Sequence, residues 1–264
     1  MYIPHLEIFQ VRNLQSLKID CHPLANIIYG VNGSGKTSLL EAVYLLGRGR
    51  SFRHRDLRLV VNHQAEELVV SAKIKKGMPA TAHQIGVKRT SSGKFAARFD
   101  GKTFQSAVQL ASVLPLQLID AHSFNLLEGG PLQRRQFLDW GVFHVEQTYG
   151  DVWKRFQKVL KQRNQLLRHG RIDEESLSVW TAEFVPLSEE VSRLRDKYLS
   201  GLVKHVKEVA RLFDGLGSLD IEYYQGWSVE ASLADVMSAD KKRDFSAGTT
   251  SHGAHKADMR IKVD

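Results

Sequence analysis

The residue types and spacing that could do chemistry lie between Gly30 and Thr37. This stretch reads Gly-Val-Asn-Gly-Ser-Gly-Lys-Thr, which fits the phosphate-binding loop pattern Gly-x4-Gly-Lys-Ser/Thr. Its three glycines allow backbone conformations that turn successive N–H groups toward a polyphosphate. We expect Lys36 to bind the β and γ phosphates and the Thr37 hydroxyl to ligate a bridging Mg²⁺. The predicted site for a Mg²⁺-nucleoside triphosphate consists of Gly30, Val31, Asn32, Gly33, Ser34, Gly35, Lys36, Thr37 and Ser38.

A strand before this loop and a helix after it would position these residues. Residues 25–29 are short and β-prone, whereas residues 38–46 repeat their apolar positions three and four apart. The helix that begins near Lys36 would point its positive end at the bound phosphates. The alternative is a glycine-rich turn in which the lysine occurs by chance.

A second stretch with chemical potential is the arginine-rich segment 47–58, which holds five arginines, a histidine and a phenylalanine. Arginines on a glycine-containing link beside a phosphate site could clamp the nucleotide or bind a DNA backbone. The candidate DNA-binding residues are Arg50, Arg53 and Arg55. The competing interpretation is a solvated basic surface.

Asp120 is a third candidate, since it follows the mostly apolar run 114–119. A buried strand that ends in an aspartate is typical of the magnesium-orienting strand in many phosphate-loop ATPases. Gln117 interrupts the run, however, and an aspartate at this position can instead be a cap or turn residue.

Composition limits the class of protein. The 264 residues carry a formal net charge of +8, which favours an anionic partner such as nucleic acid but also fits a solvated basic surface. The single cysteine, Cys21, cannot form an internal disulfide, which suits a reducing compartment. No apolar stretch approaches the length of a bilayer span. We therefore expect a soluble cytoplasmic protein without a membrane partner.

The remaining patterns predict an α/β protein. Alternating residues indicate a hairpin over 6–20 and an antiparallel meander over 66–99, followed by a helix over 103–112. Two long helices, from 132 to about 169 and from about 174 to 213, carry narrow apolar stripes, and Pro186 is a possible bend. A short joint at 170–173 makes them an antiparallel helical hairpin. Strand patterning returns at residues 219–223.

Several segments together resemble the RecF family, bacterial DNA replication and repair proteins related to SMC and ABC-type ATPase heads. The resemblance runs in order through essentially the whole sequence. The segments that carry it are the N-terminal strand pair, the loop Gly30 to Thr37 with residues 40–46, and the stretches 50–53, 129–139, 160–164 and 253–258.

The resemblance implies an ABC/SMC-type head with an antiparallel meander and an inserted helical-hairpin arm. It divides the chain into an ATP-binding lobe over 1–128, a helical arm over 129–216, and a return to the head lobe over 217–264. It implies ATP and Mg²⁺ as cofactors, ATP-dependent homodimerisation on DNA at gaps and single-strand/double-strand junctions, and action with RecO and RecR in loading RecA and in the SOS response. Arg12 matches a position where SMC-like heads place a basic residue near the phosphates.

The sequence also departs from this family pattern. ABC-type heads use a Leu-Ser-x-Gly-Gln-like signature and an acidic pair at the end of a later strand, and neither occurs in these residues. The stretch Asp120-Ala121-His122 differs from the family's Pro-Glu-Asp-like stretch. We therefore expect a C-terminally truncated member that binds ATP and hydrolyses it negligibly, with no catalytic residue assigned. The alternative is an ATPase subunit of another class, from a transporter or a small-molecule phosphotransferase.

Overall fold

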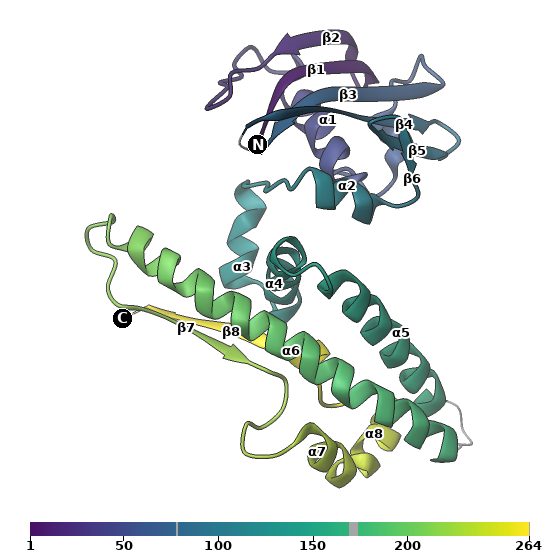
Figure 1. Ribbon diagram of the computed structural model, residues 1–264, viewed down its shortest axis with the longest axis vertical. Helices are drawn as coiled ribbons and strands as arrows, with labels where there is room; N and C mark the ends of the chain where they lie inside the picture. The colour runs from purple at the N-terminus through teal and green to yellow at the C-terminus, as the bar shows by residue number, and fades with distance from the viewer. Residues whose placement is uncertain (78, 169–173, 264) are drawn as a thin grey trace. The chain divides into compact units, whose positions relative to one another are not determined.

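The computed structural model describes residues 1–77, 79–168 and 174–263 (Figure 1). The chain forms two compact units, Met1–Leu118 and Ile119–Asp264. Each has its own hydrophobic core.

Unit 1 is built on a six-stranded antiparallel sheet in the order β2-β1-β3-β4-β5-β6 (Figure 1). The predicted hairpin and meander are both confirmed, because β1 pairs with β2 and β3 to β6 follow one another in the sheet. The pairing of β1 with β3 joins the two parts. The strands are β1 Tyr2–Val11, β2 Leu14–Asp20, β3 Glu67–Lys76, β4 Thr81–Thr90, β5 Phe95–Phe99 and β6 Lys102–Phe104.

One face of this sheet is apolar because side chains alternate along each strand. In the register of the ladder, Ile8 lies opposite Val70, and Val70 lies opposite Val87. All three are buried, together with Leu45 and Leu46 of α1 (Lys36–Arg48), which packs against this face. Helix α2 (Ala107–Val113) contacts α1, and η1 (Leu57–Val60) begins within the last residues of the arginine-rich segment. The helix predicted over 103–112 is thus shorter, since β6 takes its first residues.

Unit 2 contains the predicted helical hairpin, formed by α5 (Tyr149–Arg168) and α6 (Glu174–Ala210), which pack against each other. Its seam includes Phe156, Phe184 and Val191, all buried, and the rings of the two phenylalanines stack with centroids 5.5 Å apart. Helix α6 continues through Pro186. The predicted stripe ends early, however, because Val209 and Phe213 are exposed.

The first arm of the predicted hairpin is two helices instead of one. Helix α4 (Pro131–Val145) is capped by Glu146, and α5 begins at Tyr149. Between them lie Glu146, Gln147 and Thr148, a non-helical stretch without a proline or a glycine to mark the break.

The last residues of the chain pack within unit 2. Strand β7 (Leu219–Tyr224) contacts α6 and pairs antiparallel with β8 (Asp258–Val263), which in turn contacts α4 (Figure 1). Residues 217–264 were predicted to return to the head lobe, whereas their contacts group them with residues 119–216 in unit 2. The remaining short elements of unit 2 are η2 Ala121–Phe124, α3 Asn125–Glu128, α7 Leu233–Ala239, α8 Lys241–Ala247 and η3 Ala254–Lys256.

Two predicted strands are wrong. Residues 25–29, before the phosphate-loop motif, have no strand pairing, and Ile27 and Tyr29 are 88% and 90% exposed. Residues 114–120 likewise have no strand assignment. A β-prone segment becomes a strand only where its backbone groups find a partner strand, and the described part of the chain supplies none to either segment. In the same described residues, no helix is long and apolar enough to cross a membrane.

Candidate functional site

The phosphate-loop motif forms a turn that leads directly into α1. Gly30, Gly33 and Gly35 have φ angles of 152°, 82° and 98°, in the region that L side chains rarely adopt. Gly35 is the N-cap of α1, and a Cβ atom there would lie 2.6 Å from Cδ2 of Leu14. The backbone conformation therefore favours glycine here, and any larger residue would also push on the Leu14 side chain of the β1–β2 hairpin.

Lys36 folds back over the loop. Its ammonium donates hydrogen bonds of 2.8 Å to the carbonyl oxygens of Gly30 and Val31. The first residues of α1 carry backbone N–H groups without helical partners, which makes this end of the helix suitable for an anion. Ser34 and Thr37 are exposed beside them. The geometry thus brings the predicted cation, free N–H groups and a hydroxyl to one exposed turn.

Asn13, in the turn between β1 and β2, braces this loop and was not among the residues predicted from the sequence. Its side-chain amide donates to the Gly33 carbonyl at 2.8 Å, and its amide oxygen accepts from the Ser38 hydroxyl at 2.8 Å. Ser38, predicted as a nucleotide-binding residue, is buried. The turn-prone composition of residues 12–15 was the available signal, but nothing local indicated which residue the asparagine would contact.

Arg12 lies beside Asn13 and binds a buried carboxylate. Its Nε and a terminal nitrogen donate to the two Glu41 oxygens at 2.5 and 2.9 Å, and the other terminal nitrogen donates to the Leu59 carbonyl at 3.0 Å. Arg12 has a positive φ of 51°, and its own N–H donates to Val60 at 2.8 Å. Its predicted contact with phosphates stays a prediction.

Glu41 is the carboxylate at the centre of this arrangement, and its side chain is fully buried within α1. Burial alone raises the pKa of Glu41, but the hydrogen bonds from Arg12 and Ser51 outweigh it. The pKa of Glu41 is therefore lowered from its ordinary value, and the group is ionised at neutral pH.

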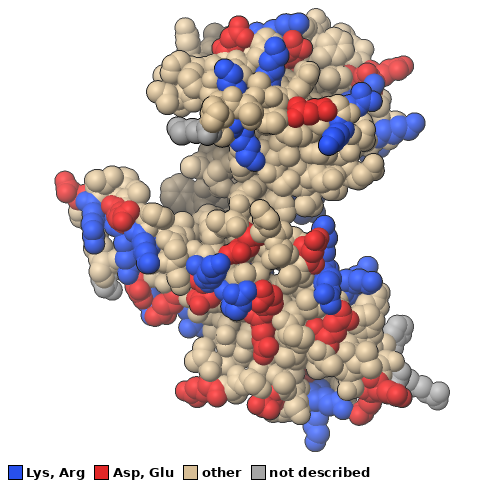
Figure 2. Space-filling model, in the orientation of Figure 1, with Lys and Arg blue, Asp and Glu red and all other residues tan. Residues whose placement is uncertain are grey.

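The arginine-rich segment 47–58 contains an open pocket of about 380 Å³. Arg50, Arg53 and Arg55 are all exposed, and Arg50 and Arg55 line the pocket. Its other lining residues are Tyr44, Ser51, Phe52 and His54. In the view of Figure 2, basic and acidic side chains are mixed over both units. The segment itself brings Arg50 and Arg55 together at one pocket.

Asp120 lies in unit 2 and caps the short helix η2. Its carboxylate accepts from the N–H of His122 at 2.9 Å, and its own N–H donates to the Ser123 hydroxyl at 2.9 Å. This is the cap role that the sequence analysis considered as the alternative. A contact of Asp120 with magnesium stays a prediction.

The stretch 129–139, which carried part of the resemblance, has a packing role in unit 2. Arg134 pairs with Asp258 at 2.7 Å, and Arg135 donates to the Ala257 carbonyl at 2.8 Å. Asp139 accepts from Arg195 at 2.7 Å, and Arg195 is 2% exposed. These side chains fasten α4 to α6 and to β8.

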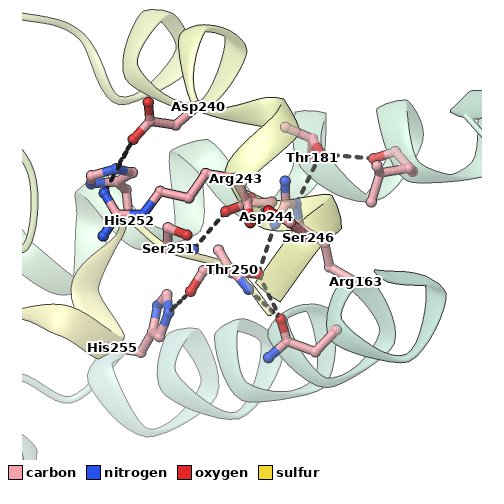
Figure 3. A network of polar contacts seen from close by, with 12 residues as sticks. Arg163, Thr181, Asp240, Arg243, Asp244, Ser246, Thr250, Ser251, His252 and His255 are labelled. Carbon is pink, nitrogen blue, oxygen red and sulfur yellow. Dashed lines mark hydrogen bonds and ion pairs between the residues drawn. The ribbon is translucent and has the colours of Figure 1, made fainter. Parts of the chain in front are cut away.

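A second polar network, shown in Figure 3, joins α5, α6, α8 and the segment before η3. Arg163 is 2% exposed and pairs with Asp244 at 2.8 Å. It also donates to Thr181 at 3.0 Å and to Thr250 at 2.7 Å. The side chains of Arg163, Asp244, Thr181 and Thr250 thus bind one another, and these contacts tie α5 to α6, α8 and the segment before η3.

Comparison with known proteins first gives the class. Residues 2–242 match the family described as "RecF/RecN/SMC N terminal domain". The phosphate loop at the start of α1, the antiparallel sheet and the helical hairpin define an SMC-type ATPase head with a helical insertion.

The family within this class follows from more similar proteins. Over 263 residues, covering all of this chain, it is 42% identical to "DNA replication and repair protein RecF" of Pseudomonas paraeruginosa and 43% identical to that of Azotobacter vinelandii. It covers 71% and 72% of those proteins. A solved structure described as "the recombination mediator protein RecF-ATP in RecFOR pathway" has the same fold, with a TM-score of 0.87, 22% identity, and coverage of 99% of this chain and 73% of that one. The chain belongs to the RecF family.

Proposed function

We propose that this chain binds ATP with Mg²⁺ at the phosphate loop and acts on DNA in replication and repair. The observation that carries the proposal is the turn into α1, where Lys36 and the first N–H groups of the helix meet beside the left-handed Gly33 and Gly35. The names of the relatives, with RecF in replication and repair and RecF bound to ATP, support it.

Within this site, each residue has a distinct proposed role. Lys36 leaves the carbonyl oxygens of Gly30 and Val31 for the β and γ phosphates, since an anionic oxygen is a stronger acceptor than a neutral carbonyl. The exposed Thr37 hydroxyl is the proposed Mg²⁺ ligand. Arg12 is proposed to add positive charge near the phosphates.

The proposed DNA contacts are Arg50, Arg53 and Arg55, which are exposed around the pocket of the arginine-rich segment. They fit phosphate oxygens of a nucleic-acid backbone, which arginine binds through paired N–H groups. We further propose binding at gaps and single-strand/double-strand junctions, ATP-dependent homodimerisation, cytoplasmic localisation, and action with RecO and RecR in loading RecA and in the SOS response.

The test of nucleotide binding is Lys36→Ala, which removes the ammonium and leaves the glycine turn intact. ATP affinity should fall at least tenfold, or about 1.4 kcal/mol, in a calorimetric titration with Mg²⁺. Lys94→Ala, an exposed lysine in the β4–β5 turn, is the matched control and should bind ATP as the wild type does. Equal affinities for the wild type and the Lys36 variant would refute the assignment.

The test of the DNA function is the salt dependence of DNA binding. For a protein that binds several backbone phosphates, the logarithm of the affinity falls linearly with the logarithm of the salt concentration, with a slope of roughly −0.9 per phosphate. A steep slope on duplex and gapped oligonucleotides separates this proposal from a transporter subunit or a small-molecule phosphotransferase. The proposal fails if DNA does not bind at low salt.

A further inference from the structure

One buried carboxylate in unit 1 joins three segments that are far apart in the sequence. Glu41, with 0% exposure, accepts hydrogen bonds from Arg12 in the β1–β2 turn and from the hydroxyl of Ser51 in the arginine-rich segment. Glu41 itself lies on α1, the helix that begins at the phosphate loop. The nucleotide function proposed above uses neither Glu41 nor Ser51.

On one side, this carboxylate is linked to the phosphate loop. Arg12, held by Glu41, precedes Asn13, whose side chain contacts Gly33 and Ser38 at 2.8 Å. The backbone of Arg12 has a φ of 51°, which is uncommon for a residue with a side chain and persists only where the surroundings enforce it. The ion pair with Glu41 is one of the contacts that enforce it, so Glu41 fixes the turn that braces the loop.

On the other side, the carboxylate is linked to the exposed arginines. The Ser51 hydroxyl donates to Glu41 and accepts the N–H groups of Arg53 at 2.9 Å and His54 at 3.1 Å. A hydroxyl has one hydrogen to donate and two lone pairs that accept, so all its hydrogen-bonding capacity is used here. Ser51 therefore fixes the backbone from which Arg53 projects.

We propose that Ser51 is a positioning residue that couples the arginine-rich segment to the phosphate loop through Glu41 and the Arg12–Asn13 turn. A triphosphate that draws Lys36 from Gly30 and Val31 changes the loop that Asn13 braces. This change reaches Ser51 through Glu41 and alters the affinity of the segment for a nucleic-acid backbone. The inference rests on the proposed ATP and DNA binding, and it adds the residue that joins them.

The coupling has a measurable size. Two coupled sites change each other's equilibrium affinity by the same factor, typically about 5- to 150-fold. We expect Mg²⁺ with a non-hydrolysable ATP analogue to change the DNA affinity of the wild type by at least fivefold. DNA should change the affinity for the analogue by the same factor.

The test is Ser51→Ala, which removes the link to the arginine-rich segment and keeps the Arg12–Glu41 pair. With a fluorescent gapped oligonucleotide at fixed salt, the ratio of DNA affinities with and without the analogue should fall to about one. Affinity for the analogue alone should stay within twofold of the wild type. Ser51→Thr keeps the hydroxyl and should restore the ratio. Ser92→Ala, which removes an exposed hydroxyl from the β4–β5 turn, is the matched control.

A second readout needs no DNA. In the wild type, the analogue alone should change hydrogen exchange at the amides of Arg53 and His54, and this change should be lost in Ser51→Ala and kept in Ser51→Thr.

The outcomes are distinguishable. If the wild type binds both ligands but the Ser51→Ala ratio equals the wild-type ratio, or if the wild-type ratio is one, the coupling is refuted and the proposed function stands. If the wild type fails to bind ATP or DNA, the proposed function and the coupling are both refuted.

Discussion

Gly35 combines two constraints at a single residue. Its φ of 98° disfavours any side chain, and its Cα faces Leu14 so closely that a Cβ would overlap it. The first constraint belongs to the backbone and the second to the packing of the hairpin on the loop. The two constraints can be separated experimentally, because other glycines of unit 1, such as Gly93, have a positive φ but no close side-chain neighbour.

We predict that Gly35→Ala lowers ATP affinity at least tenfold and destabilises the protein by about 1–3 kcal/mol. The added methyl would force the Leu14 side chain to move and would press on the Asn13 amide nitrogen, 3.4 Å away, that braces the loop. Gly93→Ala is the matched control, since Gly93 has a φ of 89° but nothing within 4 Å of a Cβ. It should lose stability from strain and keep its ATP affinity. Titration and urea denaturation measure both effects, and equal ATP affinity in the two variants would contradict the packing argument.

His255 provides a residue-scale prediction about pH. Its burial, assisted by the nearby Lys256 and Arg135, lowers the pKa of His255 to about 4, against the hydrogen bond to the Thr250 carbonyl that raises it. The unfolded chain protonates this histidine near pH 6.5. The stability that the fold gains from keeping His255 neutral is therefore fully present above pH 6.5 and is lost as the pH falls toward 4.

The titration of His255 alone should lower the free energy of unfolding by about 2 kcal/mol when the pH falls from 7.5 to 5. Urea denaturation at the two values measures the loss. His255→Gln keeps a side-chain N–H for the Thr250 carbonyl and cannot titrate, so its stability should fall less over the same range. Identical pH dependence in the variant and the wild type would show that other groups dominate.

At the scale of elements, ion pairs with little exposure hold the helices of unit 2 together. The pair between Arg163 and Asp244 joins α5 to α8, and the pair between Arg195 and Asp139 joins α6 to α4. Arg163 and Arg195 are each 2% exposed. Removing one partner of such a pair leaves a desolvated charge, which costs far more than the loss of a surface pair.

We predict that Asp244→Ala lowers the unfolding free energy by about 3–5 kcal/mol, because Arg163 then keeps its charge without the carboxylate. Asp151→Ala is the matched control on the surface, where Asp151 and Lys154 are 88% and 59% exposed and 3.4 Å apart. It should cost less than about 1 kcal/mol. Denaturant unfolding followed by far-UV circular dichroism compares them, and similar losses would mean that the buried pair is not a major constraint.

At the scale of the whole molecule, the net charge of +8 has two possible consequences. It could attract DNA as a diffuse field, or the arginine-rich segment could supply most of the contacts. On the face drawn in Figure 2, basic and acidic side chains are mixed, which favours local contacts over a diffuse field there. The two explanations differ in their salt dependence, because only bound phosphates release counterions in proportion to the contacts made.

Replacing Arg50, Arg53 and Arg55 with alanine should reduce the slope of log affinity against log salt by up to about 2–3. The matched control removes the same number of charges at Lys154, Lys158 and Lys161, which are exposed on α5. Its slope should change by less than about one. Equal changes in the two triple variants would favour the diffuse field over contacts by the arginine-rich segment.

Local patterns were sufficient for much of the molecule. The glycine spacing predicted the phosphate-loop turn, and residue alternation predicted the hairpin and the meander, because these depend on neighbours a few positions apart. The apolar repeat predicted the hairpin of α5 and α6 in the same way. Each of these signals lies within the segment that folds.

The tertiary structure decided the features that need a distant partner. Residues 25–29 have strand-forming side chains but no strand, because their backbone lacks a neighbouring strand in the described chain. Arg12 pairs with Glu41 in the structure, a contact that sequence periodicity could not reveal. The pair forms because Glu41 is buried, and a carboxylate removed from water needs a cation and hydrogen-bond donors beside it. Only the fold brings Arg12 and Ser51 to Glu41.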